Sequence, residues 1–118
     1  MCWDCRDTMS ATADADRTLT ATHPAVCRHP ETGRKALYVN CSHTTSFAGW
    51  TPEESAPLLE YLFAHQTRPE FTARISWQQG TVVIWDNRSS QHRAINDYDG
   101  HRREMWRVTL EGETPEGE

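Results

Sequence analysis

The sequence predicts a mainly β chain with one α-helix, and two observations support this prediction. The first is a helix start signal at residues 51–54, followed by apolar residues at helical spacing to about His65. The second is a series of extended runs rich in β-branched and aromatic residues, two of which, residues 71–77 and 81–85, flank a tight turn. Residue propensities alone do not separate a jelly roll from other small α+β arrangements.

The N-terminal residues 1–22 are polar and rich in Ala, Thr and Asp, without a sustained period, so we expect an irregular segment there. A short extended piece and a turn at residues 29–34 follow, because proline favours extended geometry in the residue before it and Gly33 permits a positive φ. The next apolar run predicts a short strand at residues 36–40.

The helix signal is the best defined in the chain. Thr51 suits the N-cap, Pro52 suits the first helical position, and Glu54 completes a capping box. Apolar residues then continue along one face as Ala56, Leu59, Leu62 and Phe63.

The second half of the chain predicts further strands. Residues 71–77 and 81–85 form a hairpin around a turn at residues 78–80, and a last strand covers residues 103–110. The acidic tail at residues 113–118 is expected to be disordered.

Composition and charge restrict the class of protein. The hydrophobic share is 36%, below the roughly 45–50% of typical soluble domains, which is expected of one part of a larger fold. The net charge is −5 and the basic residues are scattered, so the sequence argues against a nucleic-acid or anionic-membrane partner. The sequence contains no apolar run of membrane-spanning length and no signal-peptide core, and we therefore expect a cytoplasmic protein.

The four cysteines do not predict a zinc site. Cys2 and Cys5 form a C-x-x-C pair, but Cys27 and Cys41 lie too far apart to supply the second pair. The simplest expectation is four reduced thiols in a cytosolic protein.

The residues with the clearest chemistry follow the hairpin. His92 ends the stretch W-D-N-R-S-S-Q-H at residues 85–92 and can supply a neutral imidazole nitrogen to a divalent metal. Arg103 and Arg107 are permanent cations four residues apart, and on an extended strand they share a face. The alternative interpretation makes His92 a surface histidine and the two arginines cross-strand ion-pair partners.

This stretch resembles the C-terminal signature of the taurine/2-oxoglutarate dioxygenase family of non-haem Fe(II) enzymes. The resemblance runs from about His23 to Glu113 and implies a partial double-stranded β-helix, or jelly roll, over residues 23–112, truncated at its N-terminus. It includes these further motifs: H-P-E-T-G-R-K-A-L-Y-V-N at 29–40, H-T-T at 43–45, L-F-A-H at 62–65, R-P-E-F at 68–71 and W-D-N-R at 85–88.

The resemblance also implies roles for three residues. His92 matches the distal histidine of a two-histidine, one-carboxylate Fe(II) triad. Arg103 matches the arginine that binds the far carboxylate of the co-substrate 2-oxoglutarate. Arg107 matches the one that holds the substrate's sulfonate in taurine-oxidising members, and guanidinium suits both roles because its planar donors bind oxygens in pairs.

The other two metal ligands of the family form an H-x-D motif, which lies further before the distal histidine than the 91 residues available here. The one H-x-acid triplet before His92 is His29-Pro30-Glu31. We reject it as a substitute, because in the family this segment is an ordinary turn and proline restricts the backbone between the two ligands. The sequence therefore predicts the C-terminal portion of a dioxygenase without its H-x-D motif, whose activity by itself is not expected.

The function predicted is that of part of an Fe(II)/2-oxoglutarate-dependent dioxygenase that hydroxylates a small sulfonate-type, taurine-like or related anionic substrate. Trp106 and His43 differ from the residues usual in taurine oxidisers, so the resemblance leaves the substrate open. The alternative is a non-catalytic remnant that acts as a binding module, or as one half of a barrel with a complementing N-terminal half or a second copy as partner.

Overall fold

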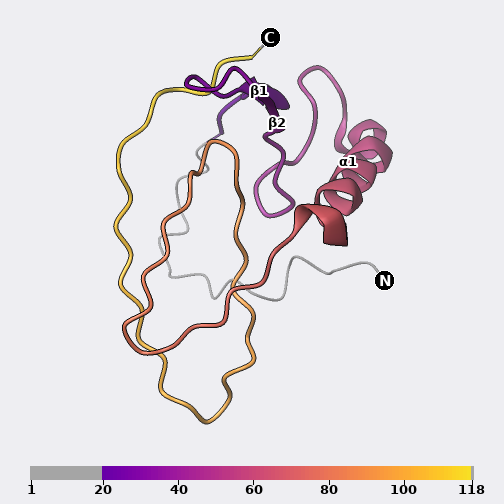
Figure 1. Ribbon diagram of the computed structural model, residues 1–118. Helices are drawn as coiled ribbons and strands as arrows, with labels where there is room; N and C mark the ends of the chain where they lie inside the picture. The colour runs from indigo at the N-terminus through magenta and orange to yellow at the C-terminus, as the bar shows by residue number, and fades with distance from the viewer. Residues whose placement is uncertain (1–19, 118) are drawn as a thin grey trace.

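The computed structural model describes residues 20–117, and its regular elements lie between residues 26 and 71 (Figure 1). Strands β1 (Val26–Arg28) and β2 (Lys35–Leu37) form a two-stranded antiparallel sheet. Helix α1 (Pro52–Gln66) and a short 3-10 helix, η2 (Pro69–Phe71), follow. The described chain is therefore mostly non-helical, with one helix and one small sheet.

The β1–β2 hairpin is closed by the turn that the sequence predicts. The register places Cys27 opposite Ala36, and the Gly33 N–H donates to the His29 carbonyl at 2.8 Å. Gly33 has a φ of 68°, a left-handed conformation that glycine adopts without steric cost. The strand predicted at residues 36–40 is shorter than expected, because ladder pairing ends at Leu37.

Helix α1 begins as the sequence predicts. The Thr51 hydroxyl accepts a hydrogen bond from the Glu54 N–H at 3.2 Å, and the Glu54 carboxylate accepts one from the Thr51 N–H at 2.8 Å. The buried residues of α1 are Ser55 and Leu59, and the Ser55 hydroxyl accepts a hydrogen bond from the Phe47 N–H at 3.0 Å. These contacts fix the helix against the segment that precedes it.

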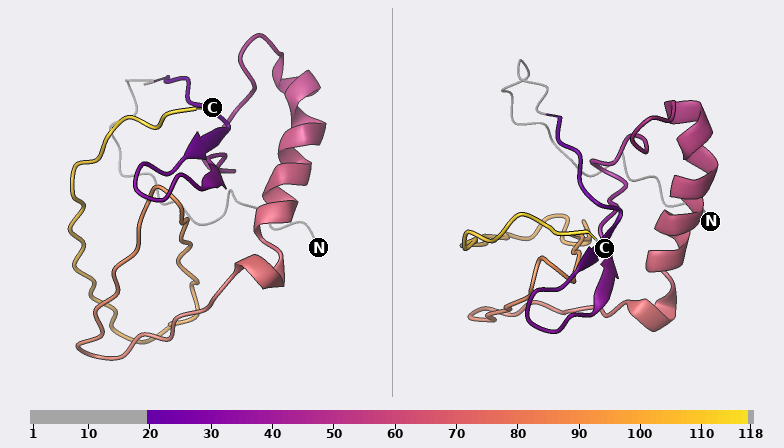
Figure 2. Two further views of the ribbon diagram at one scale, coloured as in Figure 1. Left: turned by 45° about the horizontal axis from the view of Figure 1, so that its top comes forward. Right: turned by 90° about the horizontal axis from the view of Figure 1, so that it is seen from above.

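The buried apolar core of the described chain is small. It consists of Cys27 from β1, Val39 just after β2 and Leu59 from α1. Helix α1 lies on one side of the hairpin, and the long excursions of residues 72–117 project on the other side (Figure 2). The core therefore binds the helix and hairpin to each other and leaves the excursions outside it.

The strands predicted at residues 71–77, 81–85 and 103–110 are absent from the described chain, and this corrects the sequence prediction for these three ranges. The turns between them are present. The Thr81 N–H donates to the Gln78 carbonyl at 3.0 Å, and the His101 N–H to the Tyr98 carbonyl at 3.0 Å. Extended segments become strands only when neighbouring backbone supplies ladder hydrogen bonds, and residues 72–110 lack that neighbour in the described chain.

The exposure of residues 81–85 still alternates as in a strand. Val82 and Ile84 are 83% and 92% exposed, whereas Thr81, Val83 and Trp85 are half-buried. Side chains with period two therefore form a face that the described residues do not cover.

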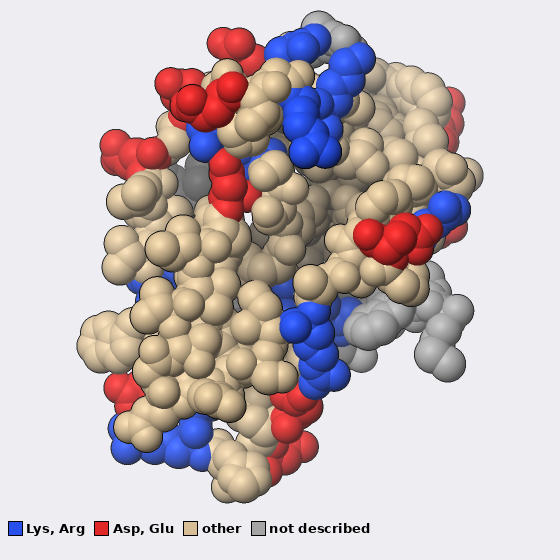
Figure 3. All heavy atoms as spheres, in the orientation of Figure 1, with Lys and Arg blue, Asp and Glu red and all other residues tan. Residues whose placement is uncertain are grey.

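The same spacing recurs near the C-terminus, where Trp106, Val108 and Leu110 are each at least 86% exposed. We call this set the open apolar side chains; its members are Val82, Ile84, Trp106, Val108 and Leu110. Figure 3 shows a broad surface without charges over the region of the excursions, with lysines, arginines and acidic residues in small separate groups.

Three smaller sequence predictions concern the tail, the thiols and the membrane. The Arg28 N–H donates to the Glu116 carbonyl at 3.1 Å, so the tail runs beside β1, and its disorder stays a prediction. Cys27 is a buried free thiol, and burial raises its pKa. Cys41 is disulfide-bonded, so the expectation of four reduced thiols is wrong for it. That expectation considered only the reducing cytosol, whereas a disulfide depends on how close two cysteines lie in the fold. None of the helices in residues 20–117 has the length and apolar character needed to cross a membrane.

Candidate metal and anion site

The turn that precedes His92 is organised by Asp86. Its carbonyl accepts a hydrogen bond from the Ser90 N–H at 2.9 Å, and its carboxylate accepts one from the Arg88 N–H at 2.9 Å. The Arg88 guanidinium binds the same carboxylate through Nε and Nη2, at 2.9 and 2.8 Å. An aspartate that bonds to the backbone two residues on is typical of a tight turn, which explains why D-N-R ends the extended run.

A long-range contact joins this turn to the β1–β2 hairpin. His29 Nε2 lies 2.9 Å from Asp86 Oδ2, across 57 residues of sequence, and the His29 side chain is only 10% exposed. Its other nitrogen, Nδ1, faces the backbone N–H groups of Glu31 and Thr32 at 3.2 and 3.3 Å. Since Nδ1 must accept from these donors, the ring proton is on Nε2 and is donated to Asp86.

Two neighbours set the charge state of Asp86. The Arg88 guanidinium, followed by the His29 hydrogen bond, lowers the pKa of the Asp86 carboxyl well below its usual range. Asp86 raises the pKa of Arg88 in turn. The carboxylate is therefore charged, and it joins the two turns at any ordinary pH.

A second contact lies immediately before His92. Gln91 Nε2 donates to the Val39 carbonyl at 2.7 Å, and Asn40 Nδ2 donates to Gln91 Oε1 at 3.4 Å. The His92 ring lies with its centroid 4.7 Å from the Trp85 indole, at an interplanar angle of 50°. The candidate metal ligand is thus exposed to solvent on one side and lies against an aromatic ring on the other.

The two candidate anion-binding arginines lie on the last excursion. The Arg103 guanidinium carbon is 5.1 Å from the centroid of the Tyr98 ring. A guanidinium above an aromatic ring contacts the ring with its own flat face, so the N–H donors in its plane stay available for a carboxylate. Arg103 and Arg107 are odd-numbered, whereas the open apolar side chains of this segment are even-numbered, so an extended chain presents them on opposite sides.

The ion pairs among residues 20–117 include neither arginine, and the anion-binding roles of Arg103 and Arg107 stay predictions. No hydrogen bond, ion pair or ring contact within the described part joins His92 to Arg103 or Arg107. The described chain therefore positions the three residues separately and does not assemble them into one cavity.

The described residues do not fit a complete iron site. No group of three or more histidine, cysteine, aspartate or glutamate side chains lies close enough to hold a metal within residues 20–117. Both ring nitrogens of His29 are engaged, one with Asp86 and one with the backbone N–H groups at Glu31 and Thr32, which agrees with rejecting His29-Pro30-Glu31 as a ligand pair. His92 remains as a single candidate ligand.

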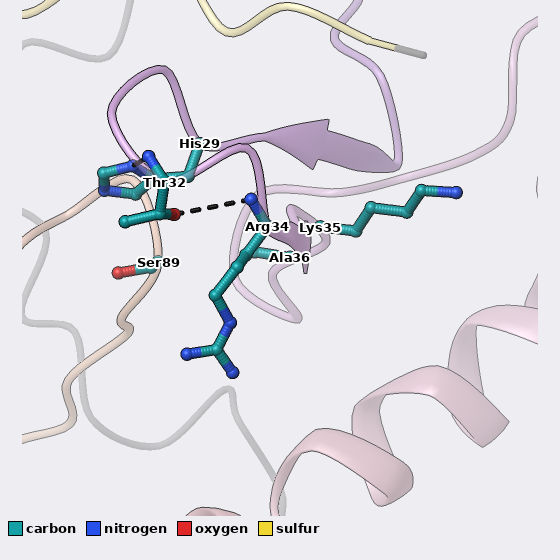
Figure 4. A pocket seen from close by; sticks show the side chains of 6 residues that line it. All are labelled: His29, Thr32, Arg34, Lys35, Ala36 and Ser89. Atoms are coloured by element: carbon teal, nitrogen blue, oxygen red, sulfur yellow. Dashed lines mark hydrogen bonds between the residues drawn. The ribbon is translucent and has the colours of Figure 1, made fainter.

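A shallow hollow of about 350 Å³ lies where the two turns meet (Figure 4). It is lined by His29, Thr32, Arg34, Lys35, Ala36 and Ser89. The Arg34 N–H donates to the Thr32 hydroxyl at 3.4 Å, and the Lys35 side chain points away from His29 (Figure 4). The hollow lies along the contact between the hairpin and the Asp86 turn, and the side chains that line it do not point toward one common position.

Sequence reasoning gave His29 and Gln91 no role, although they attach the Asp86 turn and His92 to the hairpin. No local pattern indicates these contacts, because their partners lie 57 and 52 residues away. One indirect signal of these contacts is present in the sequence: the motifs at residues 29–40 and 85–92 both belong to the same family resemblance.

Comparison with known proteins connects these features. The sequence model of the family described as Taurine catabolism dioxygenase TauD, TfdA family matches residues 3–109. The chain belongs to this family. Membership in the TauD/TfdA family confirms the resemblance seen in the sequence, and the family implies a cupin-like fold.

Several curated members are similar to the chain. It is 46% identical over 95 residues to an alkylsulfatase of Acinetobacter baylyi, covering 80% of this chain and 30% of that protein. It is 49% identical over 89 residues to an alpha-ketoglutarate-dependent dioxygenase of Penicillium expansum, and 42% identical over 95 residues to an alpha-ketoglutarate-dependent sulfate ester dioxygenase of Pseudomonas putida. These matches cover 74% and 80% of this chain, but 25% and 31% of those relatives. The chain thus spans about a quarter to a third of the length of the TauD/TfdA relatives that it matches.

Proposed function

We propose that the chain is the portion of an Fe(II)/2-oxoglutarate-dependent dioxygenase that carries the distal metal ligand and the two anion-binding arginines. The observation that supports this most directly is the match of the family model across residues 3–109, which includes His92, Arg103 and Arg107. In this proposal the extended excursions of residues 72–117 are strands of a jelly roll whose neighbours lie outside the described residues.

Each residue has one role in the proposal. His92 supplies one imidazole to iron, and the remaining ligands come from outside residues 20–117. Arg103 binds the far carboxylate of 2-oxoglutarate through its in-plane donors, while Tyr98 supports its face. Arg107, on the same side of the segment, binds the anionic group of the primary substrate.

The substrate class follows from the charge of Arg107 and from the relatives. A sulfonate or a sulfate ester presents several oxygens with one negative charge, which suits a bidentate guanidinium. Relatives in Pseudomonas putida and Saccharomyces cerevisiae are named sulfate ester and sulfonate dioxygenases. We therefore propose a small organic sulfonate or sulfate ester as substrate, hydroxylated at the carbon next to the anionic group, in a cytoplasmic enzyme.

The test is succinate formation with Fe(II), 2-oxoglutarate, ascorbate and an alkyl sulfate or taurine. Residues 1–118 alone are expected to give no more succinate than their His92→Ala variant, because one imidazole does not hold Fe(II) against water. A chimera that carries the preceding part of the Pseudomonas putida relative, fused to residues 23–118, is expected to be active. An inactive but folded chimera, or one unaffected by His92→Ala, would refute the proposal.

A second candidate function is supported by the open apolar side chains. Since they are at least 83% exposed in the described chain, the chain can instead act as a binding module or half-barrel that associates with a complementing segment or a second copy. Stable binding to the separately expressed preceding part of the relative, without turnover, would favour this candidate over the enzyme.

A further inference from the structure

We propose that His29, Asp86 and Gln91 are positioning residues for His92. Their hydrogen bonds hold the turn at residues 86–90 on the β1–β2 hairpin, and so set where the imidazole lies. The consequence for catalysis rests on the proposed function, but the positioning itself does not.

Two contacts bracket the segment that leads to His92. The bond between His29 Nε2 and Asp86 Oδ2 holds its start, and the bond from Gln91 Nε2 to the Val39 carbonyl holds its end. A single hydrogen bond would let the turn pivot about it. Two bonds five residues apart remove that freedom, so the segment is fixed relative to the hairpin although it belongs to no sheet or helix.

The hairpin end of each contact is itself well fixed. His29 is held in one orientation by the two backbone N–H groups that point at Nδ1. Val39 is 2% exposed and belongs to the core, so its carbonyl is a rigid acceptor for Gln91. The positions of these two partners are therefore set by the folded hairpin and transmitted to the turn.

The direction of His92 follows from the direction of Gln91. Where the chain leaves the turn in an extended form, consecutive side chains point to opposite sides. Gln91 points at Val39, so His92 points away from the core and lies against Trp85, at 4.7 Å between ring centroids. The Trp85 indole N–H donates to Asn87 Oδ1 at 2.8 Å, which fixes the ring that His92 contacts.

The contact with Trp85 provides a direct readout. Since the two ring centroids are 4.7 Å apart, the indole ring current acts on the His92 ring protons, and in the intact 118-residue chain we expect their NMR signals upfield of those of the exposed His43 and His101. His29→Phe and Gln91→Met keep side-chain size but remove the donors. Either substitution is expected to move the His92 signals most of the way to the positions of the exposed histidines.

Conservative variants test the donor itself. His29→Gln places a carboxamide N–H where imidazole Nε2 stands, and Gln91→Lys restores a donor toward Val39. Both are expected to recover the upfield His92 signals, which a general loss of packing would not do. His43→Ala, at an exposed position, is the matched control and is expected to leave the His92 signals unchanged.

Three outcomes would overturn the inference. They are wild-type His92 signals at exposed positions, unchanged signals in folded His29→Phe and Gln91→Met, and displaced signals in folded His29→Gln and Gln91→Lys. If the first two variants lose the circular dichroism of α1, the conservative pair decides the matter. Failure of the proposed function is separate: a fully active His92→Ala chimera refutes the ligand role, while the ring signals still report the positioning.

Discussion

Placing a lysine at Val108 tests whether the open apolar side chains drive association of the isolated chain. Val82, Ile84, Val108 and Leu110 are 83–92% exposed, and burying such side chains is worth about 1.5–3 kcal/mol each, or about 6–12 kcal/mol together. Association costs an estimated 4–15 kcal/mol in lost freedom, a similar size, so we expect weak self-association of the wild-type chain. Val108→Lys removes about 1.5–3 kcal/mol of this gain, and since about 1.4 kcal/mol corresponds to a tenfold change, Kd should rise at least about tenfold.

The assay is sedimentation equilibrium over a concentration series, which gives the average mass in solution, together with the fluorescence of a hydrophobic dye. Val108→Lys is expected to lower both the average mass and the dye signal, while the helical signal of α1 is kept. Gln79→Lys, which adds the same charge at an exposed turn residue, is the control and should behave as wild type. A dye-silent wild-type monomer with one sharp thermal transition would refute the reasoning, because the chain would then be a complete domain.

Three further predictions concern the arginines, the helix cap and Asp86. In the chimera, Arg103→Ala should weaken the binding of 2-oxoglutarate by about 2–5 kcal/mol, as for other buried charge pairs, and so raise its KM. Arg107→Ala should weaken only the binding of the primary substrate, and equal effects of both changes on the KM for 2-oxoglutarate would refute this division. Thr51→Ala should destabilise the chain by about 0.5–2 kcal/mol in thermal melts followed by circular dichroism, and Thr51→Ser should not. Because the folded-state pKa of Asp86 is lowered, its contribution to stability is present above about pH 4 and is lost as the pH falls through the lowered value. Asp86→Asn should remove that acid dependence of the unfolding midpoint, and an unchanged dependence would contradict it.

Local signals in the sequence predicted the elements that need no distant partner. The cap and start of α1 depend on Thr51, Glu54 and the proline between them, and the structure forms both hydrogen bonds of the capping box. The turns at Gly33 and Gly80 were predicted for the same reason, and both glycines have positive φ. In each case the cause lies within a few residues of the effect.

The strands and the site were predicted less well, because both depend on residues far away in sequence. Residues 81–85 have strand composition and alternate exposure, yet they form no ladder in the described chain. His92, Arg103 and Arg107 could be named from a resemblance, but composition could not show what holds them. The roles of His29 and Gln91 needed coordinates, since a hydrogen bond across 57 residues leaves no periodic pattern.

The long sequence separation of the hairpin contacts also affects how the protein is made. A ribosome adds about 5–20 residues per second, so Asp86 is synthesised about 3–11 s after His29. Helix α1 can form within about a microsecond of its release, whereas the hairpin must wait for the later turn before it gains its long-range bonds. During that interval His29 has no carboxylate to bind, and the nascent hairpin depends on its own turn. Pausing of translation between residues 67 and 86 would lengthen this exposed period, while α1, which is synthesised before the pause, would be unaffected.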